Sequence, residues 1–83
     1  PPRVSITDKS GSDGVALWVN EFLGLKGEER LSVSKIVKIF QWVMNQYEQD
    51  GRMSSVTDEE LEEQVKLHLP QQYARRKQAT LVV

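Results

Sequence analysis

The chain has 83 residues, of which 39% are hydrophobic, and its 11 basic and 12 acidic side chains give a formal net charge of -1. A chain of this length builds one hydrophobic core and leaves little material for a deep substrate cavity, so the sequence predicts that the protein is not an enzyme. The near-neutral charge attracts neither nucleic acid nor anionic lipid as a whole, and the absence of cysteine excludes disulfides and thiolate metal sites.

The expected location follows from the same composition. No apolar run in the sequence approaches the roughly 20 residues that cross a bilayer, so no membrane association is expected. A cysteine-free chain fits a reducing interior, and we therefore expect an intracellular protein of the cytosol or nucleus. The chain begins with Pro1 instead of an initiator Met, which suggests a piece excised from a larger protein.

The first 13 residues lack helical periodicity. Ser10, Gly11 and Ser12 are typical of a flexible linker. We therefore expect residues 1–13 to form a flexible N-terminal arm and residues 14–83 to form a single helical domain.

Two short stretches near the ends of the chain favour extended structure. Val4 and Ile6 alternate with polar neighbours, and residues 79–83 are the other β-prone stretch. A minor β pairing of the two termini is therefore an optional part of the predicted fold.

A first helix is predicted from Gly14 to Leu23. Ser12 or Asp13 can cap its first turn, and Gly24 is a natural stop because glycine tolerates the left-handed conformation. The apolar residues with helical spacing are Val15, Trp18, Val19 and Phe22. This stripe is predicted to face the core.

A second, longer helix is predicted over residues 33–49 as one continuous element. Ser32 is its expected cap, Leu31 and Ile36 form a hydrophobic staple, and Gly51 follows the end. The predicted core stripe comprises Val33, Ile36, Val37, Phe40, Val43, Met44 and Tyr47.

A third helix is predicted to begin after Thr57, because Thr57 and Glu60 match a capping box. Pro70 disfavours helical geometry at the residue before it, so this helix is expected to end near His68. A short fourth helix is expected over residues 71–78. The predicted fold class is therefore mainly α, a small bundle of three main helices plus a short fourth, and a winged-helix-like variant is compatible with this outline.

The central helix carries the main candidate for a contact surface. On a helical wheel Trp42 lies opposite the predicted core stripe and Ile39 lies on its flank. One interpretation buries both between two neighbouring helices. The other exposes them as an anchor for another protein or a second copy of the chain, flanked by polar residues that join the partner-binding set, namely Lys35, Lys38 and Gln46.

A second candidate surface is the one basic cluster of the sequence, at its C-terminal end. Its members could touch nucleic acid or an acidic partner, and they are Tyr73, Arg75, Arg76 and Lys77. Four glutamates on the third helix oppose nucleic-acid binding by repelling phosphate. A solvated helix end explains the same cluster without any ligand.

No motif for catalysis, metal binding or cofactor binding is present in the sequence. His68 has no nucleophile or orienting acid at a recognisable spacing, and no phosphate-binding glycine loop occurs. The sequence therefore predicts a non-catalytic protein–protein interaction or self-association module without cofactor or metal. Its partner would contact a second apolar face of the central helix. The alternative is a small winged-helix-like module that binds nucleic acid through the basic cluster.

Overall fold

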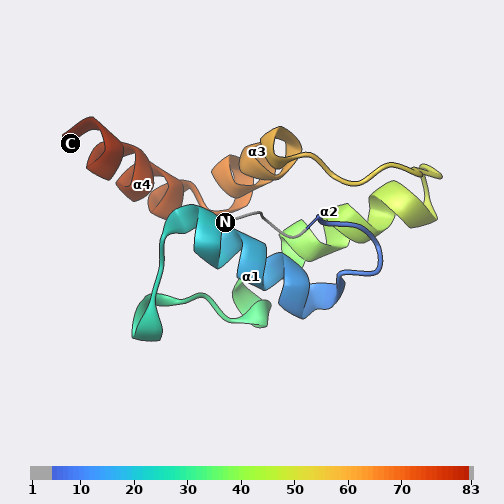
Figure 1. Cartoon of the computed structure of the whole chain (residues 1–83), viewed down its shortest axis with the longest axis horizontal. Helices are drawn as coiled ribbons and strands as arrows, with labels where there is room; N and C mark the ends of the chain where they lie inside the picture. Colours follow the sequence, from blue (N-terminus) through green and yellow to red (C-terminus); the bar gives the residue numbers. More distant parts are fainter. Residues whose placement is uncertain (1–4, 83) are drawn as a thin grey trace.

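A computed structural model describes residues 5–82 of the chain, and it describes side chains as far as residue 76. The described part is mainly helical, which confirms the predicted fold class (Figure 1). Its elements are α1 (Gly11–Leu23), η1 (Gly27–Glu29), η2 (Val33–Lys35), α2 (Val37–Glu48), α3 (Asp58–His68) and α4 (Pro70–Val82), where η marks a single turn of 3-10 helix. Helices α1, α2 and α3 enclose the core, and α4 continues outward from the end of α3 (Figure 1).

Helix α1 begins three residues earlier than the sequence predicted. The backbone enters it through Gly11 at φ 70°, a left-handed conformation that glycine adopts without a steric penalty. The N-cap residue is Ser10, whose side chain makes no capping hydrogen bond, so the predicted caps at Ser12 and Asp13 are wrong. The predicted end is confirmed, because Gly24 takes φ 69° and donates its N–H to the last turn.

The sequence predicted one continuous helix over residues 33–49, and this prediction is wrong, because the segment forms two separate elements, η2 and α2. The η2 turn bonds each N–H to the carbonyl three residues back, and Ile36 then leaves helical geometry at φ -117° and ψ 18°. The Ser32 hydroxyl lies 2.9 Å from that of Ser34 and caps no backbone N–H. Helix α2 therefore starts only at Val37.

The buried face of α2 is rotated by about 60° from the predicted core stripe, counting 100° per residue. Ile36, Ile39 and Val43 are at most 1% exposed, whereas Val37, at the opposite edge of the predicted stripe, is 43% exposed. The buried face of α2 differs from the predicted one because α2 contacts both α1 and α3, and the core lies between these two neighbours.

Helix α3 has the boundaries that the sequence predicted. The Thr57 hydroxyl accepts from the Glu60 N–H at 3.1 Å, and the Glu60 carboxylate accepts from the Thr57 N–H at 2.9 Å. This capping box sets the start of the helix. Leu69, at φ -131°, separates the end of α3 from Pro70, which opens α4. The fourth helix is longer than predicted.

The extended residues near the N-terminus pair with a different partner from the predicted one. Ile6 forms an isolated antiparallel bridge with Val56, whose N–H donates to the Ile6 carbonyl at 2.8 Å. Residues 79–82 lie in α4, so the predicted pairing of the termini is wrong for the described residues. The division into an arm and a domain stays a prediction, although Ile6 within the arm is only 1% exposed.

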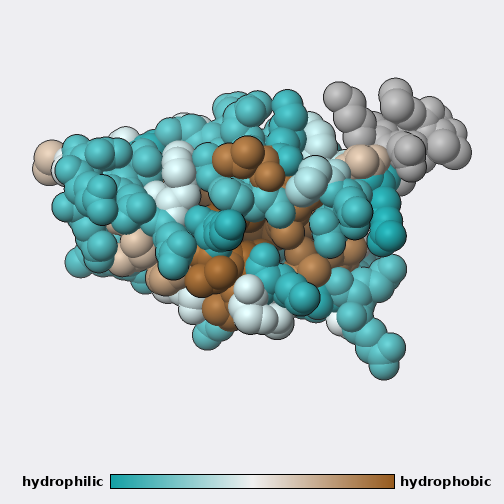
Figure 2. Space-filling model, turned by 180° about the vertical axis from the view of Figure 1, so that it is seen from behind, coloured by the Kyte–Doolittle hydropathy of each residue, from teal (hydrophilic) through white to brown (hydrophobic). Residues whose placement is uncertain are grey.

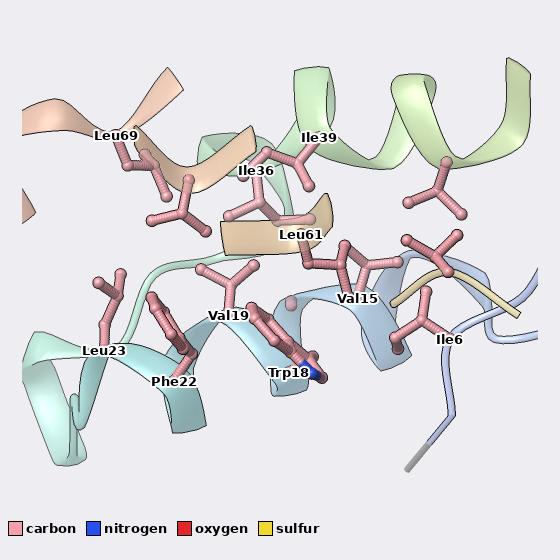
Figure 3. Close-up of a cluster of buried hydrophobic side chains, with 14 residues drawn as sticks. Ile6, Val15, Trp18, Val19, Phe22, Leu23, Ile36, Ile39, Leu61 and Leu69 are labelled. Atoms are coloured by element: carbon pink, nitrogen blue, oxygen red, sulfur yellow. The ribbon is translucent and has the colours of Figure 1, made fainter. Parts of the chain in front are cut away.

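The core is a single apolar cluster to which α1, α2, α3 and Ile6 contribute (Figure 3). One polar side chain, Asn20, is also buried in the described part of the chain. Its amide nitrogen donates to the carbonyls of Ala16 and Leu31 at 3.0 Å each, and its oxygen accepts from the Leu31 N–H at 2.7 Å. Asn20 therefore fixes the connection that follows α1 while satisfying its own polar atoms.

Candidate functional site

The predicted contact pair on the central helix is not an exposed pair. Ile39 is 0% exposed and belongs to the core, so its predicted exposure is wrong. Trp42 is half-buried and packs against the core cluster. The interpretation with two neighbouring helices accounts for both residues, because α1 and α3 lie on either side of α2.

The polar residues predicted to flank that pair have different surroundings. Lys35 and Lys38 are exposed near the start of α2. Gln46 is half-buried, and its side-chain oxygen accepts from Arg52 Nη1 at 3.2 Å. Gln46 therefore takes part in the fold, whereas a contact role for the two lysines stays a prediction.

The residues of the basic cluster also separate in the structure. Arg75 is exposed, and the side chain of Lys77 lies outside the described residues. Tyr73 and Arg76 are half-buried and turn back onto the bundle. Among the described side chains, the structure therefore does not bring Tyr73, Arg75 and Arg76 together as one cationic surface.

Tyr73 and Arg76 join a column of aromatic rings that connects α4 to α1. Trp18 stacks on Phe22 with ring centroids 5.0 Å apart, and Phe22 stacks on Tyr73 at 6.4 Å. The Arg76 guanidinium lies 4.0 Å from the Phe22 ring centroid, and its Nε donates to the Phe22 carbonyl at 2.7 Å. A cation is favourable there, because the last carbonyls of α1 form the negative end of the helix dipole.

Tyr73 also links α4 to α3. Its hydroxyl donates to Glu62 Oε2 at 2.7 Å, and the Lys66 ammonium lies 5.7 Å from its ring centroid. The hydrogen bond to Glu62 raises the pKa of Tyr73 above its ordinary value, because removing the proton would break that bond. Tyr73 and Arg76 thus orient α4 against the two helices beside it.

The sequence reasoning missed a second polar cluster, in the connection between α2 and α3. The Arg52 guanidinium binds the Glu60 carboxylate through two hydrogen bonds of 2.6 and 2.7 Å. It also donates to the carbonyls of Ser54 and Ser55 at 3.1 and 2.8 Å. Arg52 therefore braces the whole connection. The sequence does contain a signal for this ion pair, since Arg52 precedes Glu60, the glutamate of the capping box, by eight residues across a turn.

The electrostatics of this cluster favour the charged forms of both partners. The hydrogen bond from Arg52, with those from Thr57, lowers the pKa of Glu60 from 4.5 to about 2. The same hydrogen bond to Glu60 raises the pKa of Arg52. The two charges neutralise each other, so the cluster offers little net charge to a ligand.

An open hollow of about 470 Å³ lies beside the braced connection. It is lined by Thr7, Asp8, Lys9, Tyr47, Arg52 and Met53. The Tyr47 hydroxyl donates to the Ser54 carbonyl at 2.7 Å, so its proton is hydrogen-bonded to the connection between α2 and α3. Asp8 and Lys9 are exposed among its lining residues, and the lining offers no nucleophile with an adjacent base.

Residues 5–82 contain no group of three or more histidine, cysteine, aspartate or glutamate side chains placed to hold a metal ion. None of the helices described here is long and apolar enough to cross a membrane.

Two curated proteins are similar to the chain over most of its length. The citrate (Re)-synthase of Syntrophus aciditrophicus is 40% identical over 68 residues, which is 80% of this chain and 11% of that protein. The citrate (Re)-synthase of Clostridium kluyveri is 37% identical over 73 residues, which is 86% of this chain and 16% of that protein. No protein-family model and no solved structure matches the chain.

These similarities correct the functional prediction. The sequence alone indicated a non-catalytic interaction module that is not an enzyme, with a nucleic-acid-binding module as the alternative. Both similar proteins bear the name of a synthase, so that prediction is wrong. A length of 83 residues excludes a catalytic site only in a complete catalytic unit, whereas this chain spans 11% and 16% of the length of these relatives.

Proposed function

We propose that the chain is a helical part of an enzyme of the citrate (Re)-synthase type, and that this enzyme forms citrate. The observation that supports the proposal is the similarity to two proteins of that name, at 40% and 37% identity, from two organisms. Each similarity extends over at least 80% of the chain, so it involves the helical bundle and not a short motif within it. An intracellular location, first expected from the absence of cysteine, belongs to the same proposal.

The role of the chain within such an enzyme follows from what its polar side chains do. Asn20, Arg52 and Arg76 each hold one connection or one helix in place. These three side chains donate hydrogen bonds to backbone carbonyls within the bundle, and they thereby stabilise its shape. We infer that the bundle supplies a rigid platform, and that forming the new carbon–carbon bond of citrate depends on the remaining length of the enzyme.

A hybrid enzyme tests the proposal directly. The 73-residue matching segment of the Clostridium kluyveri protein is replaced by the corresponding residues of this chain. Citrate produced from an acetyl thioester and oxaloacetate is then measured by mass spectrometry. With a labelled acetyl group, a citrate-cleaving enzyme of known stereospecificity shows which prochiral arm carries the label. We expect citrate with the stereochemistry of the parent enzyme.

Two variants of the hybrid serve as controls. Val19 is 0% exposed, so V19D places a carboxylate in the core and should abolish folding and citrate formation together. Glu28 is exposed on η1, so E28Q should leave both unchanged. A hybrid that is soluble and folded, with the parent's molar mass, and still forms no citrate would refute the proposal.

A further inference from the structure

Helix α4 is attached to the bundle differently from the other three helices. Its described side chains are those of residues 70–76, and none of them is buried, whereas α1, α2 and α3 each bury side chains in the core. Figure 2 shows hydrophobic residues gathered in the middle of one face and mainly hydrophilic residues toward the ends, and α4 extends toward one end of the molecule (Figure 1). The described part of α4 therefore gains less from apolar burial than the other helices do.

Contacts of Tyr73 and Arg76 hold α4 in its docked position. The Tyr73 hydroxyl donates to Glu62 on α3, and Arg76 Nε donates to the Phe22 carbonyl at the end of α1. The two side chains also lie against the Phe22 ring. Tyr73 and Arg76 are half-buried, so water reaches these hydrogen bonds and replaces them when α4 moves away. Breaking them therefore costs little compared with opening the core.

The junction between α3 and α4 interrupts the helical hydrogen bonds. Leu69 has φ -131° and ψ 55°, which lie outside helical geometry, and Pro70 has no N–H to donate to α3. The two helices therefore do not form one rigid rod. Leu69 is 7% exposed and anchors the junction in the core, so a rotation of α4 is confined to the backbone around Pro70.

We propose that α4 is a hinged helix that detaches from α1 and α3 as one unit, about Leu69 and Pro70, while the other three helices stay folded. Local opening of this kind is expected where a unit has few buried apolar contacts. Phe22 is 8% exposed when α4 is docked, and detachment uncovers its ring beside the negative end of α1. The fold thus contains a conformational switch that exposes this surface in one state only. The inference does not depend on the proposed function.

Hydrogen exchange of single backbone amides in the 83-residue chain tests the hinge. NMR follows the exchange at a pH where the rate reports the opening equilibrium. An isolated 13-residue helix is marginal in water, so detached α4 loses its hydrogen bonds and its amides exchange. We expect the amides of Ala74, Arg75 and Arg76 to exchange at least about tenfold faster than those of Ile39 and Val43, and within about threefold of one another, after correction for their intrinsic rates. Exchange of all five at the same rate, or protection that falls steadily from Ala74 to Arg76 as in a fraying end, would overturn the proposal.

A conservative core substitution separates detachment of α4 from unfolding of the whole chain. Ile39 is 0% exposed, so I39V weakens the core without emptying it and should speed exchange of the Val43 amide by about two- to tenfold. The α4 amides should keep their rates, because the core is intact in the docked and detached states alike. An acceleration of the α4 amides equal to that of Val43 would show that α4 opens only when the bundle unfolds, and the hinge would be refuted.

Y73F is the complementary variant, because it removes the hydroxyl that donates to Glu62 and keeps the ring against Phe22. The detached and unfolded states both lack that hydrogen bond, so Y73F should speed the α4 amides and the Val43 amide by the same factor, about fivefold. The matched control is E59Q, at an exposed position of α3, which should change neither set. Unchanged exchange of the α4 amides in Y73F would mean that detachment does not break the contact with Glu62, and the proposed docked and detached states would be wrong.

Discussion

Arg52 shows how a single side chain can determine the shape of a connection. Its guanidinium fork binds both carboxylate oxygens of Glu60 and two backbone carbonyls, a geometry that lysine cannot reproduce. The side chains of Arg52 and Glu60 are 16% and 37% exposed, so solvent screens part of their attraction. The paired hydrogen bonds still make this interaction stronger than an ordinary surface ion pair.

We expect E60Q to lower the free energy of unfolding by about 1 to 2 kcal/mol, after allowing for solvent screening. The glutamine keeps an oxygen for the Thr57 N–H but loses the charge that faces Arg52. The matched control is E63Q, which removes a carboxylate 3.5 Å from Lys66 in a pair with side chains 47% and 70% exposed. That change should stay within about 0.5 kcal/mol. Urea unfolding measures both, and equal effects would contradict the bracing role of Arg52.

The same carboxylate predicts a dependence of stability on pH. The pKa of Glu60 in the folded protein is about 2, below its ordinary value of 4.5. A lowered folded-state pKa contributes stability above the unfolded-state value and loses it as the pH falls through the folded-state value. The difference in melting temperature between the unmodified chain and E60Q should therefore be constant above about pH 5.5 and shrink between pH 4.5 and about 2. A difference that does not change on acidification would be inconsistent with this assignment.

At the scale of elements, the helices differ in how much of each could be predicted. Helix α3 was predicted at both ends because its signals are local, with a capping box at the start and Pro70 after the end. The start of α2 could not be predicted in this way. The turn at Ile36 brings that side chain into the core, and the position of the core depends on α1 and α3.

Helix α4 is an element whose charges were interpreted as a binding surface, whereas two of its side chains serve its own attachment. Tyr73 reaches Glu62 on α3, and Arg76 reaches Phe22 on α1. A helical wheel of α4 alone cannot distinguish a solvated arginine from one that caps another helix, because the acceptor lies 54 residues away in sequence.

We expect R76M to loosen α4 without unfolding the bundle. Methionine keeps much of the aliphatic contact with Phe22, but it removes the cation over the ring and the hydrogen bond to the carbonyl. The backbone amides of α4 should exchange with deuterium at least about tenfold faster, while those of Ile39 and Val43 in the buried face of α2 stay protected. R75M is the matched control, since Arg75 is exposed. If R75M accelerates exchange as much as R76M, the attachment does not depend on Arg76.

At the scale of the whole molecule, the sequence predicted the number and order of the helices but not the assembly to which they belong. Helical periodicity is a local property, and it was sufficient for the fold class. The braced connection at Arg52 depends on side-chain hydrogen bonds between residues eight apart across a turn, which helical periodicity does not report. Catalysis was excluded from chain length, and that inference fails for a bundle whose similar proteins are several times longer.

The final prediction concerns the cooperativity of the bundle, which has one core shared by α1, α2 and α3. Ile39 is 0% exposed at the centre of that core, so I39A should lower the free energy of unfolding by about 2 to 4 kcal/mol through lost burial and the cavity left behind. That is a large fraction of the stability of so small a domain. V37A, at a position 43% exposed on the same helix, should change it by no more than about 0.5 kcal/mol.

Urea unfolding followed by both tryptophan fluorescence and circular dichroism distinguishes a shared core from separate ones. Trp18 reports on α1 and Trp42 on α2, while circular dichroism reports on all helices. Because the core is shared, I39A should shift both transitions to the same lower midpoint. Two separate transitions, or an effect of I39A no larger than that of V37A, would mean that Ile39 does not join the three helices into one cooperative unit.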